Sequence, residues 1–121
     1  MAALSPPTDL APRGDGMGYG DVLMAGRGAD VFSRDSQVMR DASPISHVTQ
    51  RTPPLLLIVG DHDFPMLAAD SEKFRIACAA TSSDVTVLTA ANKDHMGVAG
   101  ALLEDSPVQD AVIKFLRRVT E

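Results

Sequence analysis

The run Leu55–Val59 constrains the fold of this chain more than any other feature of its sequence. All of its residues are apolar, and it lies between the pair Pro53-Pro54 and Gly60. A strand with one face in solvent alternates apolar and polar residues, whereas a strand buried on both faces is continuously apolar. The sequence therefore predicts a central strand of a parallel sheet. A proline at its start is allowed because the ladder of hydrogen bonds has not yet begun.

The segments that follow this run predict a β-α-β-α order. A helix is expected over roughly Met66–Ala80, from its amphipathic spacing, and a second strand over Asp84–Thr89. The last helix begins at Ser106, with Pro107 in its first position and Gln109 completing a capping box. Its apolar stripe consists of Val108, Ala111, Val112, Phe115, Leu116 and Val119. Strands joined by such helices pair in parallel with right-handed crossovers, so the expected fold class is α/β.

The first part of the chain differs from the rest. Residues 1–42 contain most of the glycines and several prolines, which predicts loops with short helical pieces such as a turn at Val22–Ala25. Gly14–Gly18 resembles a phosphate loop, but no strand precedes it and no Lys-Ser/Thr pair follows it, so a flexible loop is expected. Residues 43–121 form the predicted α/β portion, and it opens with Ser43 as a candidate N-cap before Pro44.

Charge and composition argue against several classes of function. The net charge of −5 gives no support for nucleic-acid binding, which favours basic surfaces. The single cysteine, Cys78, permits no intrachain disulfide and fits a buried position in its helix. The N-terminus lacks the charged and apolar regions of a signal peptide, and no apolar run is long enough to span a bilayer. We therefore expect a cytoplasmic protein that does not contact membranes.

Two polar residues follow the predicted strands. Asp63 comes after the strand Leu55–Val59 and His95 comes after the next strand, so both lie at the carboxyl edge where open α/β sheets bind ligands. An acid followed by a histidine in this order is typical of the last two members of a Ser-Asp-His triad in α/β hydrolases. The alternative is a polar turn and a loop histidine with no catalytic role, since both are common.

A metal site is a further alternative at the same edge. Asp61, His62, Asp63, Asp94 and His95 carry ligand atoms that suit hard or borderline ions. No zinc spacing such as His-x-x-x-His is present, and the cysteine lies in a predicted helix. We therefore predict neither a metal nor a cofactor.

A resemblance to a known family favours the hydrolase interpretation. Residues 53–67 resemble the acid-bearing segment of α/β-hydrolase esterases and lipases, within the carboxylesterase, feruloyl-esterase-like and kynurenine-formamidase-like branch. Further segments fall where that branch has its equivalents: 42–48, 71–74, 93–97 and the helix that begins at Ser106-Pro107. The resemblance covers roughly residues 41–119.

The resemblance implies that Asp63 is the triad acid and His95 the triad base. Asp61 and His62 would be loop residues, and Asp94 would help to orient the loop that carries the histidine. The implied reaction is acyl transfer from a small carboxylic ester or an amide to water, through a serine acyl-enzyme and without a cofactor.

Parts of the family pattern are missing from this chain. No G-x-S-x-G nucleophile elbow occurs in the sequence, and no His-Gly-Gly-type oxyanion segment occurs either. Several serines lie outside any predicted elbow and are expected in turns or caps: Ser33, Ser36, Ser43 and Ser46. Because losing one oxyanion donor costs about 100- to 1,000-fold in rate, we expect the chain alone to be inactive. It is interpreted as the C-terminal part of a serine ester hydrolase with an incomplete α/β-hydrolase fold.

Two other classes of function stay open beside the incomplete hydrolase. One is a non-catalytic binding or interaction module on a hydrolase-derived scaffold; the other is an unrelated small α/β domain.

The incomplete-hydrolase interpretation also predicts the partners of the chain. No strand of consequence is predicted before Leu55–Val59, so one edge of that strand would be unpaired. The expected partners are an ester substrate once another chain completes the site, or a second copy in a homodimer through that edge.

Overall fold

A computed structural model describes residues 1–11, 33 and 35–121 of the chain. The predicted loop Gly14–Gly18 and the predicted turn Val22–Ala25 lie outside these residues. The chain divides into two compact units, one comprising Met1–Pro6 with Thr49–Glu121 and the other Pro7–Val48. The start of the chain therefore belongs with the segment that follows residue 48, although the sequence predicts only loops and short helical pieces there.

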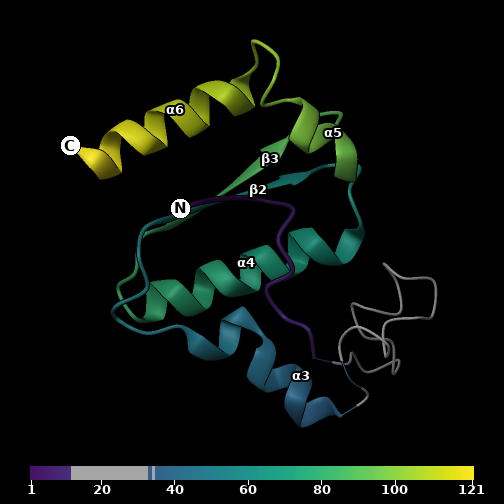
Figure 1. The fold of residues 1–121 in the computed structure, drawn as a ribbon, viewed down its shortest axis with the longest axis vertical. Helices are drawn as coiled ribbons and strands as arrows, with labels where there is room; N and C mark the ends of the chain where they lie inside the picture. The colour runs from purple at the N-terminus through teal and green to yellow at the C-terminus, as the bar shows by residue number, and fades with distance from the viewer. Residues whose placement is uncertain (12–32, 34) are drawn as a thin grey trace. The chain divides into compact units, whose positions relative to one another are not determined.

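A parallel sheet with strand order β1-β2-β3 forms the centre of the larger unit (Figure 1). The strands are β1 (Ala2–Leu4), β2 (Leu55–Gly60) and β3 (Val85–Ala90). Every residue of β2 is buried, which confirms the central parallel strand predicted from its apolar run. The prediction that one edge of this strand is unpaired is wrong, because Ala3 of β1 pairs with Leu57 of β2.

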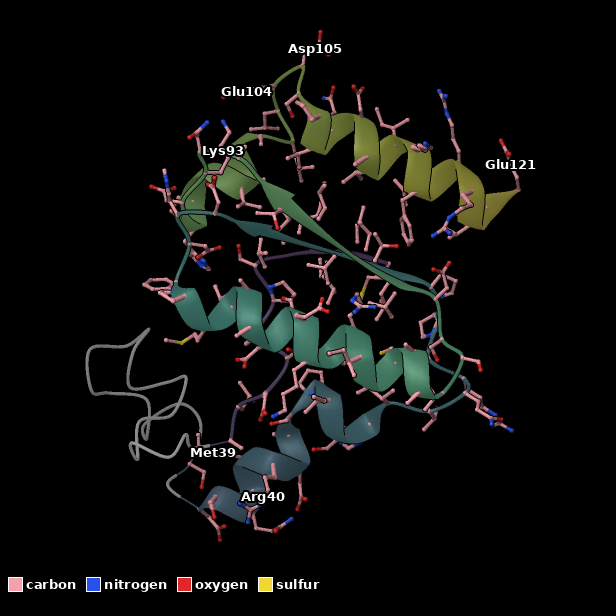
Figure 2. All side chains as sticks on the ribbon, turned by 180° about the vertical axis from the view of Figure 1, so that it is seen from behind. Met39, Arg40, Lys93, Glu104, Asp105 and Glu121 are labelled. Atoms are coloured by element: carbon pink, nitrogen blue, oxygen red, sulfur yellow. The ribbon has the colours of Figure 1, made fainter. Side chains whose placement is uncertain are left out.

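Helices cover both faces of this sheet. The helix α4 (Pro65–Ala80) lies on one face, and α5 (His95–Gly100) and α6 (Pro107–Thr120) lie on the other (Figure 1). Side chains fill the space between the helices and the sheet (Figure 2). Ile58 of β2 belongs to the core formed with α5 and α6, together with Val98 and Phe115. The expected α/β class is confirmed.

The helix α6 begins where its sequence predicts but leaves part of its apolar stripe exposed. Val108 and Phe115 are buried, whereas Leu116 is 45% and Val119 37% exposed. Among the described residues, the sheet against which α6 packs has three strands. An open groove of about 270 Å³ is lined by residues of α6 and of the sheet, among them Phe115 and Leu88.

The cap of α6 differs in one bond from the predicted capping box. The hydroxyl of Ser106 accepts the backbone N–H of Gln109 at 3.3 Å, as predicted. The side chain of Gln109 donates to the carbonyl of Leu102 at 3.1 Å instead of returning to the cap residue. Ser106 itself donates to the carbonyl of Ala101 at 2.6 Å, which ties the start of α6 to the end of α5.

The smaller unit contains α3 (Ser36–Ala42) and a short 3₁₀ helix, η1 (Pro44–His47). Ser43 precedes η1 as predicted, but its hydroxyl makes no capping bond. It donates to the carbonyl of Met39 at 2.8 Å and accepts the N–H of Leu10 at 2.8 Å, so it is a packing residue within this unit. Among the described helices, none has the length and apolar content needed to cross a membrane.

Candidate active site

Asp63 and His95, which lie 32 residues apart in the sequence, are in direct contact at the carboxyl edge of the sheet. The Oδ1 atom of Asp63 is 2.9 Å from Nδ1 of His95. The carboxylate side chain is 1% exposed and the imidazole 38% exposed. The arrangement therefore combines a buried acid with a histidine that solvent and small molecules can reach.

Backbone hydrogen bonds join the two loops that carry this pair. The N–H of Asp61 donates to the carbonyl of Ala90 at 3.1 Å, and the N–H of His62 donates to the carbonyl of Lys93 at 3.1 Å. The carboxylate of Asp61 accepts the N–H of Lys93 at 3.2 Å. A β-carbon on Gly60 would lie 2.0 Å from the Lys93 carbonyl oxygen, so the close approach of the loops requires glycine there. Asp61 and His62 therefore take part in the hydrogen bonds that join the two loops.

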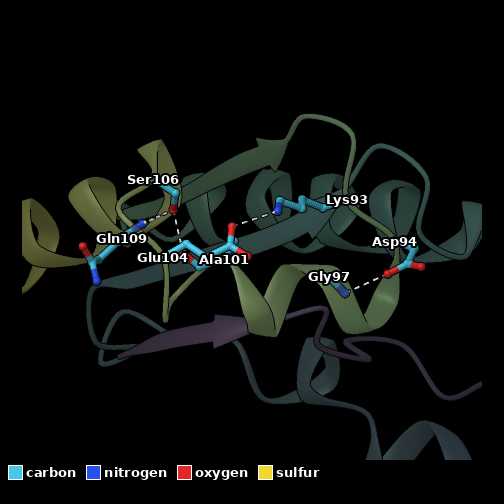
Figure 3. A network of polar contacts seen from close by, with 7 residues as sticks. All are labelled: Lys93, Asp94, Gly97, Ala101, Glu104, Ser106 and Gln109. Carbon is cyan, nitrogen blue, oxygen red and sulfur yellow. Dashed lines mark hydrogen bonds and ion pairs between the residues drawn. The ribbon is translucent and has the colours of Figure 1, made fainter.

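His95 begins α5, where the sequence predicts only a loop. Asp94 caps this helix by accepting the N–H of Gly97 at 2.7 Å (Figure 3). Lys93 forms an ion pair with Glu104 at 3.3 Å, which links the start of α5 to the segment after it. Two glycines in a short helix weaken its sequence signal, which explains why the pattern did not predict it. The cap fixes the backbone from which the imidazole projects.

Ser5 also belongs to this site, although the sequence pattern does not indicate it. It follows β1 with a backbone φ of 43°, is 5% exposed, and donates its hydroxyl to Oδ2 of Asp63. The backbone N–H of Phe64 donates to Oδ1 of the same carboxylate at 2.8 Å. In the sequence, the position of Ser5 is marked only by the short apolar run Ala2–Leu4 before the Ser5-Pro6 pair. That run is too brief to predict a strand.

These contacts keep the acid ionised. Burial raises the pKa of the Asp63 carboxyl, but hydrogen bonds from Ser5, the Phe64 amide and His95 outweigh that effect. The net result is a pKa below the ordinary value of 3.8. At neutral pH the histidine therefore faces a charged acceptor that can hold the proton on Nδ1.

The imidazole borders a hollow of about 290 Å³. The Phe64 ring lies against the His95 ring with centroids 5.2 Å apart and planes at 55°. Met96 and Pro65 also line the hollow, and Met96 is 75% exposed. Within the described part of the chain, Nε2 of His95 has no hydrogen-bond partner, so it can accept a proton from a group that enters the hollow.

No other described group completes a nucleophile or a metal site here. The Ser5 hydroxyl bonds to the acid and not to the imidazole, and burial raises the pKa of the Cys78 thiol. The hydroxyls of Ser43 and Ser46 bond to backbone carbonyls of their own unit. Across residues 1–11, 33 and 35–121, no three His, Cys, Asp or Glu side chains are placed to hold a metal ion.

Comparison with solved structures defines the class of fold. A truncated form of a carbohydrate esterase from the gut microbiota superposes with a TM-score of 0.73 at 17% sequence identity. The match covers 99% of this chain and 42% of that chain, so this chain spans less than half of that relative. The α/β fold with its short parallel sheet is therefore the C-terminal portion of an α/β-hydrolase-like fold, as the resemblance implies.

The sequence itself identifies the family. Residues 22–121 match the profile of the prolyl oligopeptidase family, so the chain belongs to that family. No curated protein matches the chain. Family and fold together support a hydrolase portion and agree with the α/β-hydrolase superfamily expected from the sequence.

Proposed function

We propose that this chain is the C-terminal part of a serine hydrolase in which His95 is the general base and Asp63 orients it. The observation that carries the proposal is the 2.9 Å contact between the buried carboxylate and Nδ1 of His95, whose side chain is 38% exposed and lines the hollow. In acyl transfer, such a carboxylate fixes the imidazole tautomer, and Nε2 takes the serine proton and returns it to the leaving group.

The proposed substrate class is a small carboxylic ester or an amide. The family name refers to peptide bonds and the structural relative is described as an esterase of carbohydrates, and both reactions transfer an acyl group to water. A triad base and acid serve either bond, so the leaving group depends on residues that this chain does not supply. A cofactor has no role in the proposed reaction.

The nucleophile and the oxyanion donors are proposed to come from a segment outside this chain. The sequence contains no G-x-S-x-G elbow, and Ser5 is engaged by the acid. We propose that completing strands add to the outer edge of β1, which is the end of the sheet on that side among the described strands. In isolation, the same edge would accept a second copy of the chain.

A non-catalytic interaction module is the second candidate. The groove of about 270 Å³ beside α6 favours it, because apolar residues such as Leu56 and Leu88 line an open surface there. This candidate requires nothing of the Asp63–His95 pair beyond stability. The protonation of the imidazole tests the pairing with Asp63 that the first candidate requires.

The experiment is nitrogen-15 NMR of the histidine side chains at neutral pH. If His95 is a triad base, its neutral form carries the proton on Nδ1 and leaves Nε2 bare. In Asp63→Asn we expect that preference to weaken, because the charged acceptor is gone. His62→Gln serves as the control, since His62 is exposed and its loss should leave the His95 signals unchanged.

Hydrolysis of p-nitrophenyl acetate by the same folded samples completes the test. We expect equal rates for the wild type and His95→Ala, and no covalent adduct with a fluorophosphonate probe, because the sequence has no G-x-S-x-G elbow. A His95 that carries its proton on Nε2 in the wild type would refute the proposed role. A rate that depends on His95 together with a labelled serine would instead locate a nucleophile within the chain or across a dimer.

A further inference from the structure

Ser5 holds the second oxygen of the Asp63 carboxylate. Its hydroxyl donates to Oδ2, while His95 and the Phe64 amide are bound to Oδ1 at 2.9 and 2.8 Å. Rotation about the last side-chain bond of an aspartate is otherwise broad and roughly two-fold. With both oxygens engaged from different elements, the carboxylate has one orientation toward the histidine.

The backbone brings Ser5 to this point at a conformational cost. The N–H of Ser5 donates to the carbonyl of Ile58 at 2.7 Å, which extends the β1–β2 pairing by one residue. Its φ of 43° is left-handed, a region that residues other than glycine seldom adopt. Such conformations persist where the surrounding contacts determine them, and they concentrate at functional sites.

The contact does not suit a nucleophile. Ser5 is 5% exposed, and its hydroxyl proton is given to the acid and not to the histidine. A triad serine donates to Nε2 of its histidine, whereas the Ser5 hydroxyl donates to Asp63, whose other oxygen contacts Nδ1 of His95. The Ser5 hydroxyl therefore binds the carboxylate oxygen of Asp63 that the imidazole does not contact.

We propose that Ser5 is a positioning residue that fixes the Asp63 carboxylate in the orientation needed to hold His95. The inference rests on the proposed function in taking Asp63 as the triad acid. The same hydrogen bond also lowers the pKa of that carboxyl, against the effect of burial. His95 is the one titratable partner of the carboxylate among the described residues. A serine that did not donate to the carboxylate would leave the titration of Asp63 unchanged.

The test follows the Asp63 carboxyl carbon by carbon-13 NMR as the pH is lowered, in the wild type, Ser5→Ala and Ser5→Gly. We expect both variants to bind the carboxyl proton about threefold or more tightly, because a donor to the charged form is lost. Ser5→Gly removes the hydroxyl and relieves the left-handed backbone, so it covers the case in which Ser5→Ala does not fold. Ser82→Ala is the matched control, since Ser82 has a φ of 60° and is exposed.

The line width of the His95 Nδ1 proton is the second readout. We expect it to broaden in both Ser5 variants as the carboxylate gains rotational freedom, and to stay sharp in Ser82→Ala. Unchanged Asp63 titration in a folded Ser5→Gly would overturn the inference. An altered titration, with His95 carrying its proton on Nε2 in the wild type, would uphold the contact between Ser5 and the acid and reject the proposed hydrolase role instead.

Discussion

At the scale of single residues, the buried carboxylate of Asp63 makes stability depend on pH. Its pKa in the folded chain lies below the ordinary value of 3.8, so its contribution is present above that value and is lost as the pH falls through the folded pKa. We expect Asp63→Asn to lower the free energy of unfolding at pH 7 by about 1.5–3 kcal/mol, the usual worth of hydrogen bonds to a charged group. Urea unfolding between pH 7 and pH 3 measures this difference.

The difference between wild type and variant should narrow as the pH falls below 3.8, because protonation removes the charge that the variant lacks throughout. Asp110→Asn is a control on an exposed helical carboxylate and should show a small effect at every pH. If the free energies of unfolding of the wild type and Asp63→Asn differed by the same amount from pH 7 to pH 3, the lowered pKa of Asp63 would be contradicted.

Of the three side chains joined at this site, the sequence predicts Asp63 and His95 but not Ser5, for a physical reason. Asp63 and His95 each follow a strand with a recognisable pattern, and parallel strands end at one edge, so their juxtaposition follows from topology. Ser5 lies 58 residues from Asp63, after a strand that only its pairing with β2 identifies. Three residues are too few to carry a periodic signal, so this contact required the tertiary structure.

At the scale of elements, Gly60 sets how closely the β2 and β3 loops approach. Its missing side chain leaves room for the Lys93 carbonyl, which a β-carbon would meet at 2.0 Å. Because the obstacle is backbone, Gly60→Ala must push the loops apart, and we expect it to cost about 1–3 kcal/mol or more in unfolding free energy. The histidine NMR spectrum should change with it, since the loops carry both members of the pair.

Gly100→Ala is the matched control within the same region. A β-carbon on Gly100 meets nothing within 4 Å, and the residue is helical, so alanine should be neutral or stabilise by up to about 1 kcal/mol. Urea unfolding of both variants makes the comparison. Equal changes in the free energy of unfolding for Gly60→Ala and Gly100→Ala would show that backbone propensity, and not the close approach of Gly60 to Lys93, determines the effect of the substitution.

The elements that the sequence predicts are those with strong local patterns. The strand at Leu55, the helix before Ala80 and the helix after Ser106 were each placed within a residue or so of their observed ends. The capped α5 lacks such a pattern because its glycines disfavour a helix. In the fold, Asp94 caps it and Val98 is fully buried in the core. Leu116 lies on the apolar stripe but is 45% exposed, because the stripe alone does not indicate which of its residues another element covers.

At the scale of the whole molecule, the outer edge of β1 decides how the isolated chain behaves in solution. Met1 and Ser5 bond to β2 through the Met1 carbonyl and the Ser5 N–H, so by strand alternation the N–H groups of Ala2 and Leu4 face away from β2. Unpaired strand groups recruit another strand, and we expect the purified chain to self-associate with rising concentration.

Replacing Ala2 by proline tests this edge, because proline removes an outward N–H while the inward groups of Met1, Ala3 and Ser5 remain paired. We expect sedimentation velocity to show dimer formation weakened about tenfold or more in Ala2→Pro, since a two-fold dimer loses this donor twice. Ala2→Ser keeps the N–H and should associate as the wild type does. A wild-type chain that stays monomeric at high concentration, or a proline variant that dimerises equally well, would show that the association proposed for β1 does not occur.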